Sequence, residues 1–254
     1  MNLFDLTGRV ALITGGNGGI GLGMAKGLAA AGAAVMIAGR SVAKNAEAVR
    51  ALTELGARAS SLEVDLTREA DCRGIAAETA RRLGGLHILV NNAGTNIRKR
   101  PEDYTLADWH TIIDTNLTSA FLASQAAYPE MVRAGFGKVI NVGSMMSLFG
   151  GAVHAAYGAS KGGLVQFTKS LAVAWAMQNI QVNALLPGWI DTDLTKRARR
   201  EIDGLHERVL TRTPAARWGE PADFAGIAVF LASAASDFVT GAAIPIDGGY
   251  SSVG

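Results

Sequence analysis

Short apolar, β-branched runs alternate with longer Ala-rich amphipathic segments along the chain. The short runs predict seven strands, at Val10–Thr14, Ala34–Ala38, Ala59–Val64, Leu86–Asn91, Lys138–Val142, Gln181–Leu186 and Ala243–Ile246. The longer segments predict helices, at Ile20–Ala31, Val42–Leu55, Arg68–Leu83, Leu106–Ala134, Ala155–Gln178 and Pro221–Ser233. Regular alternation of this kind predicts an α/β fold in which one doubly wound parallel sheet of about seven strands carries helices on both faces, in three layers.

The stretch 191–217 breaks this rhythm, because it is polar, charged and longer than an ordinary connection in an α/β fold. It follows the carboxyl end of a predicted strand, which is where such folds bind ligands. We therefore expect a substrate lid there. No repeat or low-complexity linker divides residues 1–254, so we expect a single domain.

Composition narrows the function classes. The 254 residues are 49% hydrophobic and 18% charged with a net charge of +2, which gives no general attraction to nucleic acid or membranes. The basic run 196–200 is followed at once by Glu201 and Asp203, so we interpret it as a solvated helix face. A single cysteine, Cys72, excludes an internal disulfide. We see no signal peptide and no membrane span, and expect a cytoplasmic protein with a small-molecule substrate and no metal.

A glycine-rich loop, Thr14-Gly15-Gly16-Asn17-Gly18-Gly19-Ile20-Gly21, joins the first predicted strand to the first helix. Glycines allow the backbone to approach a pyrophosphate closely, and the helix N-terminus supplies free N–H groups. The loop therefore predicts a dinucleotide site. Two registers fit equally well, Gly16-x-Gly18-x-x-Gly21 and Gly15-x-x-x-Gly19-x-Gly21.

The end of the second strand, Gly39-Arg40-Ser41, indicates which dinucleotide binds. It has no carboxylate to bind the ribose hydroxyls of NAD, and Arg40 stands where the 2′-phosphate of NADP would lie. This favours NADP(H). NAD(H) stays open, since Arg40 could instead pack over the adenine as a surface residue.

Four further motifs come at or just after predicted strands: Asn91-Asn92-Ala93-Gly94, Ser144, Tyr157 with Lys161, and Pro187-Gly188. The carboxyl ends of parallel strands lie along one edge of a sheet, so we expect all four motifs to face one crevice. Tyr157 and Lys161 are four residues apart, hence one turn apart on one helix face.

These side chains suit acid/base chemistry. A free tyrosine has a pKa of about 10, and we expect the neighbouring ammonium of Lys161 to lower it. Ser144 can hydrogen-bond a substrate oxygen and hold it beside Tyr157. The set predicts an oxidoreductase that moves a hydride between a nicotinamide and a carbonyl or alcohol substrate, with Tyr157 as the acid/base.

With these motifs, from Gly8-Arg9-Val10 to Ile246-Asp247-Gly248-Gly249, the chain resembles the classical short-chain dehydrogenase/reductase family. The resemblance implies a Rossmann-like NAD(P)-binding domain, selects the Gly15/Gly19/Gly21 register and implies a homotetramer. It also implies a catalytic tetrad of Asn116, Ser144, Tyr157 and Lys161, in which Asn116 holds a water that relays protons through Lys161. The cofactor contacts that it implies are Gly15, Asn17, Gly18, Gly19, Ile20, Gly21, Arg40, Ser41, Asp65 (at the adenine), Leu66, Asn92, Ala93, Gly94, Tyr157, Lys161, Pro187, Gly188, Ile190 and Thr192 (near the nicotinamide).

Within this family, residues 91–99 and 217–221 resemble bacterial sugar-acid dehydrogenases of the gluconate 5-dehydrogenase and 2-deoxy-D-gluconate 3-dehydrogenase type. Arg98 could pair with a substrate carboxylate, although it could equally be a surface or interface residue. The candidate substrate contacts are Arg98, Ser144, Met146, His154 and Trp189. Alternatives are a reductase of apolar ketones, steroids or 3-oxoacyl thioesters, and a non-catalytic NADP(H)-binding protein; the complete Ser144, Tyr157 and Lys161 set argues against the latter.

Overall fold

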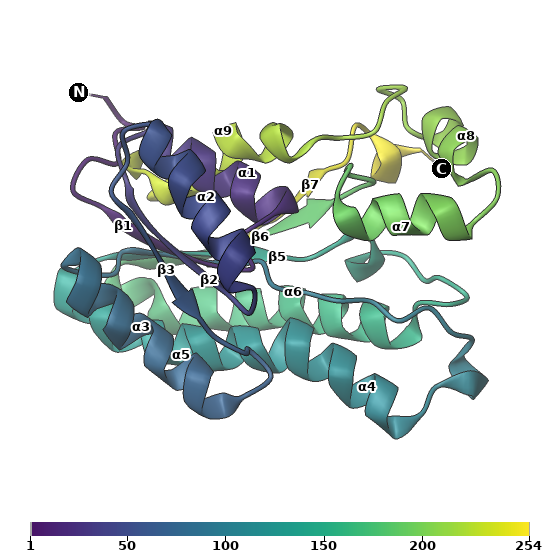
Figure 1. Cartoon of the computed structure of the whole chain (residues 1–254), viewed down its shortest axis with the longest axis horizontal. Coiled ribbons are helices and arrows are strands. Elements are labelled where there is room, and N and C mark those ends of the chain that lie inside the picture. Colours follow the sequence, from purple (N-terminus) through teal and green to yellow (C-terminus); the bar gives the residue numbers. More distant parts are fainter. Residues whose placement is uncertain (1, 254) are drawn as a thin grey trace.

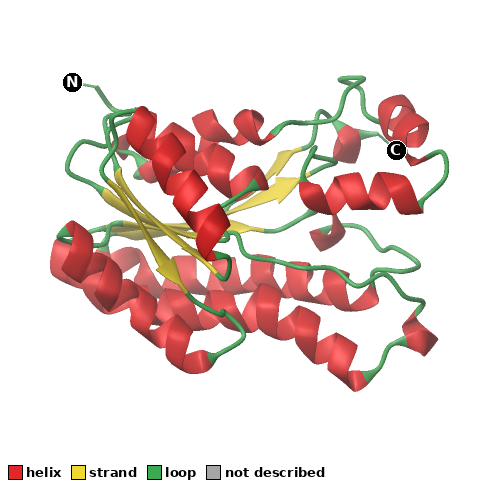
Figure 2. Ribbon diagram, in the orientation of Figure 1, coloured by secondary structure: helices red, strands yellow, loops and turns green. Residues whose placement is uncertain are grey.

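A parallel sheet runs through the middle of the molecule in the computed structural model, which describes residues 2–253 (Figures 1 and 2). Its seven strands follow the order β3-β2-β1-β4-β5-β6-β7. Their bounds are β1 Val10–Thr14, β2 Ala34–Gly39, β3 Ala59–Glu63, β4 Ile88–Asn91, β5 Gly137–Val142, β6 Ile180–Pro187 and β7 Ala243–Ile246. The order reverses between β1 and β4, and such a switch point opens a crevice at the carboxyl ends of the strands.

Helices cover both faces of this sheet (Figure 1). One face carries α1 (Gly19–Ala30), α2 (Val42–Glu54) and α9 (Ala225–Ala232). The other carries α3 (Glu69–Leu83), α4 (Leu106–Ile113), α5 (Ser119–Ala134) and α6 (Ala155–Trp175). This arrangement confirms the predicted doubly wound fold.

The strand register brings the carboxyl ends of four strands, from which the motif-bearing loops leave, to one edge of the sheet. Thr14 pairs with Asn91, Asn91 with Asn141, and Asn141 with Ala184, so β1, β4, β5 and β6 end side by side. All four strands are buried along their whole length, as their nearly continuous apolar runs predict for a sheet covered on both faces. The loops that leave them therefore start from a rigid base.

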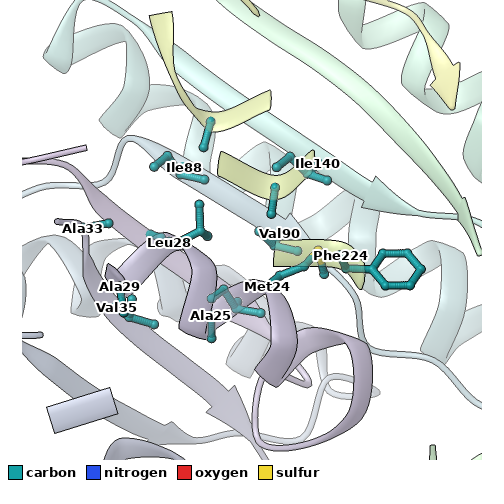
Figure 3. Close-up of a cluster of buried hydrophobic side chains, with 14 of the residues drawn as sticks. Met24, Ala25, Leu28, Ala29, Ala33, Val35, Ile88, Val90, Ile140 and Phe224 are labelled. Atoms are coloured by element: carbon teal, nitrogen blue, oxygen red, sulfur yellow. The ribbon is translucent and has the colours of Figure 1, made fainter. Parts of the chain in front are cut away.

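One hydrophobic cluster fastens α1 to the sheet (Figure 3). Met24 and Leu28 of α1 pack with Ile88 and Ile140 of the central strands, and all four are fully buried. Gly27 lets the start of α9 lie against α1, because a Cβ there would come within 2.8 Å of Ala225. The N-terminus of α1, where the glycine loop ends, is thereby held in place.

Two predicted segments are more complex than the sequence pattern indicates. The helix predicted over Leu106–Ala134 is broken by a π-helical turn at Asp114–Thr118, between α4 and α5. The predicted lid, 191–217, contains two helices, α7 (Asp193–Glu201) and α8 (Leu205–Arg212). The other predicted elements are confirmed within two residues at each end once adjoining 3-10 turns are included. Within residues 2–253, no helix is long and apolar enough to cross a bilayer.

His87, just before β4, accepts a hydrogen bond at Nδ1 from the Val10 backbone N–H at 3.0 Å. Its ring stacks on that of Phe136 with the centroids 5.2 Å apart, and the Arg9 guanidinium lies over the Phe136 ring, 3.9 Å from its centroid. Burial, followed by the charge of Arg9, lowers the pKa of His87 below its ordinary value of 6.5. The neutral imidazole is therefore the form that the fold accepts.

We expect His87→Asn to reduce the loss of stability in acid, because an amide oxygen keeps an acceptor for Val10 without titrating. Below pH 6.5 the unfolded chain binds a proton at His87 more readily than the folded chain does, so stability falls as pH drops towards the folded-state pKa. The contribution is at most about 1.4 kcal/mol per pH unit. Urea unfolding at neutral pH and at about pH 5.5 measures it; equal acid losses for both proteins would contradict it.

Candidate active site

The glycine loop turns sharply between β1 and α1. Gly15 and Gly19 have φ values of +62° and +50°, which other residues rarely adopt. A Cβ on Gly21 would collide with Asn92 and come within 2.6 Å of the Gly15 carbonyl oxygen. These features favour the Gly15/Gly19/Gly21 register. No side chain caps α1 at Gly18, so the first-turn N–H groups are available to an anionic ligand.

Asn92 ties the loop after β4 to the glycine loop. Its Nδ2 donates to the carbonyl oxygens of Thr14 and Gly15, both at 3.0 Å. The backbone N–H groups of Asn92 and Ala93 donate to Thr14 Oγ1 at 3.0 and 3.2 Å. The two loops that flank the switch point are therefore one hydrogen-bonded unit.

Two cavities meet at this unit and form a continuous cleft. One, of about 540 Å³, and another, of about 310 Å³, share Asn17, Lys44, Asn92 and Gly94. The larger contains Gly15, Arg40, Ser41, Asp65, Leu66 and Ala93. The smaller contains Gly18, Gly19, Ile20, Ser144, Tyr157, Lys161, Pro187, Gly188, Ile190 and Thr192. Of the expected cofactor contacts, Gly21 alone lines neither cavity; it packs behind the loop.

The larger cavity has a basic end. Arg40 is exposed there, and Ser41 caps α2 by accepting a hydrogen bond at Oγ from the Lys44 backbone N–H. Asp65 accepts hydrogen bonds from the N–H and hydroxyl of Thr67, which lower its pKa; the charge of Arg40 acts in the same direction. The Arg40 guanidinium beside the N-terminus of α2 forms a good environment for a phosphate.

Ser144, Tyr157 and Lys161 line the smaller cavity together. Lys161 is 3% exposed and donates through Nζ to the Val142 carbonyl oxygen at 2.7 Å. Burial lowers the pKa of Lys161 to about 8. Ser144 accepts a hydrogen bond at Oγ from the Met146 N–H at 3.1 Å, which fixes its hydroxyl at the cleft wall.

The expectation that Lys161 lowers the pKa of Tyr157 is wrong for the protein chain by itself. Burial raises the pKa of the phenol, and Ser144 and the Arg98 charge oppose this rise only in part. Burial also lowers the pKa of Lys161, 5.9 Å from the centroid of the tyrosine ring, to about 8, so its ammonium loses its proton before a phenol of raised pKa ionises. The tyrosine is therefore a neutral acid in this state.

Asn116 lies in the π-helical turn and is 1% exposed. Its Nδ2 donates to the Thr95 carbonyl oxygen and to Ser160 Oγ, both at 3.0 Å, and its Oδ1 accepts from the Thr95 N–H at 2.7 Å. A Cβ built on Gly94 would lie 3.4 Å from both Asn116 Oδ1 and Lys161 Nζ. The structure thus brings the expected tetrad together, with the amide of Asn116 clamping the loop after β4.

Three of the remaining expected substrate contacts lie around Tyr157. The positive charge of Arg98 acts to lower the pKa of both Tyr157 and His154, and the ring centroids of these two residues are 6.4 Å apart. Met146 packs, with Phe149, against an apolar cluster beside Ser144. Arg98 Nε is buried without a hydrogen-bond partner.

Trp189 is not placed in this group. It packs edge-to-face on Trp218 at 5.6 Å and lines a separate cavity on the far side of Ile190. Its position next to Gly188 in the sequence suggested the cleft, but the bridge between Ile190 and Gly219 turns it towards the lid core. Trp189 therefore lies apart from the other expected substrate contacts, and its assignment to the substrate site stays a prediction.

Sequence reasoning missed several residues at the site. Lys44, Asp193 and Thr195 line the cleft, and Ser160 joins Asn116 to the Tyr157 carbonyl oxygen. A signal existed for Thr195, which forms a capping box with Thr192 at the start of α7. Lys44 and Ser160 carried no comparable pattern. Within residues 2–253, no group of three or more His, Cys, Asp or Glu side chains is arranged to hold a metal ion.

Comparison with known proteins places these features in context. A family model described as enoyl-(acyl carrier protein) reductase matches residues 15–251. A 2-dehydro-3-deoxy-D-gluconate 5-dehydrogenase of Dickeya dadantii is 39% identical over 98% of each chain. A gluconate 5-dehydrogenase of Gluconobacter oxydans is 38% identical over 98% of this chain and 96% of its own. The crystal structure of a gluconate 5-dehydrogenase from Burkholderia cenocepacia, in complex with NADP and tartrate, has 40% identity and a TM-score of 0.94, over 100% of this chain and 99% of that one.

Gly21→Ala tests the close contact behind the glycine loop. We expect it to lower the free energy of unfolding by about 1–3 kcal/mol, because the added methyl group displaces Asn92 or Gly15. Gly18→Ala is the matched control, since no atom lies within 4 Å of its Cβ position and its φ of 179° is extended. Urea unfolding measures both variants. Stability unchanged in Gly21→Ala would show that this contact does not constrain the loop.

Proposed function

The chain belongs to the short-chain dehydrogenase/reductase family of nicotinamide-dependent oxidoreductases, and we propose that it interconverts a secondary alcohol and a ketone on a sugar acid with NADP(H). The observation that carries this proposal is the grouping of Ser144, Tyr157 and Lys161 in a cleft that continues into a larger basic cavity. Arg98, whose Nε is buried and has no hydrogen-bond partner among residues 2–253, contributes a charge that lowers the pKa of the same tyrosine.

The residues present fit a dinucleotide. The uncapped first turn of α1 and the glycine loop suit the pyrophosphate, and Asp65 with Leu66 lines the region suited to the adenine. Thr192 lies in the smaller cavity near Tyr157, on the side suited to the nicotinamide. When bound, the nicotinamide supplies the acceptor or donor of the hydride.

Side chains of the protein transfer the proton of the substrate hydroxyl group. In the oxidative direction, a bound oxidised nicotinamide would accept the hydride from the substrate carbon, and the Tyr157 oxygen, in its ionised form, would take the hydroxyl proton. Ser144 holds the substrate oxygen beside that phenol. The Arg98 charge favours the ionised tyrosine, as does any positive charge close to the phenol, including the Lys161 ammonium. Reduction runs the same steps backwards, with Tyr157 as the acid that the buried phenol already is.

The choice of NADP rests on Arg40 and on the relatives. Arg40, Ser41 and the N-terminus of α2 surround one end of the larger cavity, and no carboxylate follows β2 there. Three similar structures were solved with bound NADP, including that of the Burkholderia cenocepacia enzyme. A guanidinium suits the 2′-phosphate through paired N–H donors.

The choice of a sugar acid rests on Arg98 and on the names of the similar enzymes. A half-buried guanidinium beside the acid/base suits the carboxylate of a hydroxy or keto acid. A second candidate, reduction of an apolar ketone or a 3-oxoacyl thioester, is favoured by the apolar wall of Met146 and Phe149 and by the description of the matching family model. The complete tetrad argues against a non-catalytic cofactor-binding protein.

We further propose that the whole chain acts as one domain whose segment 191–217 is the substrate lid, and that four copies assemble. The α5 and α6 face exposes apolar side chains, with Phe121 44% and Val173 83% exposed, which a second copy would cover. The single buried cysteine, Cys72, suits the reducing cytoplasm.

Tyr157→Phe tests the reaction. We expect turnover to fall by about two to four orders of magnitude, because only the acid/base group is removed. NADPH binding should change little, since the ring remains. Following nicotinamide absorbance with gluconate, keto-gluconates, neutral sugars and apolar ketones measures turnover and substrate class together. Near-normal turnover in the variant would contradict the mechanism, and wild-type activity on apolar ketones alone would remove the sugar-acid substrate.

Arg40→Ala tests the cofactor. We expect the Kd for NADPH to rise about ten- to a hundredfold and the Kd for NADH to change much less, because the guanidinium pairs with the extra phosphate. Arg50→Ala, an exposed arginine on α2, the helix that follows Arg40, lines neither half of the cleft and is the control. Fluorescence titration of each reduced cofactor supplies the values. An equal rise in the Kd for NADPH and for NADH would mean that Arg40 does not bind the 2′-phosphate.

A further inference from the structure

Helix α7 of the lid forms an ion pair at each end, one with a residue that lines the cleft and one with Arg98 near Tyr157. At its first residue, Asp193 Oδ2 lies 3.1 Å from Lys44 Nζ, which lines both cavities. At its last residue, Glu201 Oε2 lies 3.9 Å from Arg98 Nη1, on the loop after β4. The helix thus links the cavity suited to the cofactor with Arg98, the residue proposed to bind the substrate carboxylate.

The Arg98 pair leaves the guanidinium incompletely satisfied. The side chain is 22% exposed, its Nε is buried without a partner, and the contact with Glu201 is an ion pair too long for a hydrogen bond. A buried donor without an acceptor costs free energy that a well-placed oxyanion would recover. The pairing with Glu201 is therefore weaker than what a bound carboxylate could offer at the same arginine.

Glu201 can leave Arg98 at little cost. Its side chain is 49% exposed, and Oε1 already accepts a hydrogen bond from Arg197 Nε at 2.8 Å, one turn earlier on the helix. The opposite end of α7 is held more firmly, since Thr195 and Thr192 form a capping box there. A change at Glu201 can thus occur while the first turn of the lid keeps its place.

We propose that Glu201 is a displaceable internal competitor for the substrate carboxylate, so that it sets the enzyme's affinity for anionic substrates. Without such a substrate it pairs with Arg98 across the cleft. A substrate carboxylate takes over Arg98, and Glu201 turns to Arg197 and to solvent. This inference rests on the proposed sugar-acid function, because a neutral substrate gains nothing from displacing Glu201.

Glu201→Gln tests this directly, with Glu207→Gln as the matched control; Glu207 is an exposed carboxylate of the same lid, on α8. Calorimetric titration at fixed salt measures the binding of gluconate and of neutral glucitol to each protein saturated with NADP⁺. We expect Glu201→Gln to lower the Kd for gluconate roughly two- to fivefold, the range of a partly exposed ion pair, and to leave that for glucitol unchanged. An unchanged or higher Kd for gluconate in Glu201→Gln would overturn the proposal, as would the same gain in Glu207→Gln.

Arg98→Ala separates failure of this proposal from failure of the proposed function. If sugar acids bind through Arg98, this variant weakens gluconate binding, and adding Glu201→Gln to it produces no further gain. If Arg98→Ala leaves gluconate binding intact, the carboxylate site itself is misplaced. If gluconate depends on Arg98 but Glu201→Gln has no effect, only the competitor role is lost.

Discussion

The ammonium group of Lys161 lies almost completely buried at the carboxyl end of β5, where it donates a hydrogen bond to the Val142 carbonyl oxygen. A charge in that position is costly, and burial lowers its pKa to about 8. The fold supports it by bringing α6 down onto the strand ends, with Asn116 and Ser160 bonded beside it. The same packing buries the phenol of Tyr157 one turn away and raises its pKa. Without ligands, the site therefore holds a protonated Tyr157 phenol beside a Lys161 ammonium that loses its proton more easily than usual. The charge of a bound ligand then changes the pKa of both groups.

A second positive charge, that of Arg98, also affects Tyr157. Arg98 acts on Tyr157 from the loop after β4, and that loop is fixed at its start by Asn92 and at Thr95 by Asn116. The cation that suits a substrate carboxylate thus also favours the ionised tyrosine. The lid adds carboxylates at both ends of α7, paired with Lys44 and Arg98, so the cleft is bounded by groups that can exchange partners with ligand anions.

Much of the fold followed from local pattern. The seven strands and the layers were predictable because short, mostly apolar runs alternate regularly with longer amphipathic segments, and the glycine loop because glycines cluster between the first strand and the first helix. Asn116 became a candidate only through the family resemblance, since an asparagine inside a helix has no local signature. The π-helical turn around it, and the hydrogen bond to Ser160, depend on contacts between segments far apart in the chain.

Side-chain direction and electrostatics were harder to predict. Trp189 turned away because the lid builds its own aromatic cluster with Trp218 and His206. The pKa of Tyr157 is shifted opposite to expectation because helix spacing places Lys161 near the ring but cannot show that burial raises the pKa of the phenol and lowers that of the lysine.

An ultraviolet pH titration of the Tyr157 phenol, taken as the difference between wild type and Tyr157→Phe, tests this balance most directly. Without cofactor we expect ionisation above the ordinary tyrosine value, because burial raises the pKa. With saturating NADP⁺ we expect the midpoint to fall by at least about one pH unit, because an added positive charge near the ring favours the phenolate. A midpoint at the ordinary value in both states, unmoved by NADP⁺, would contradict the claim that the site tunes this tyrosine as its acid/base.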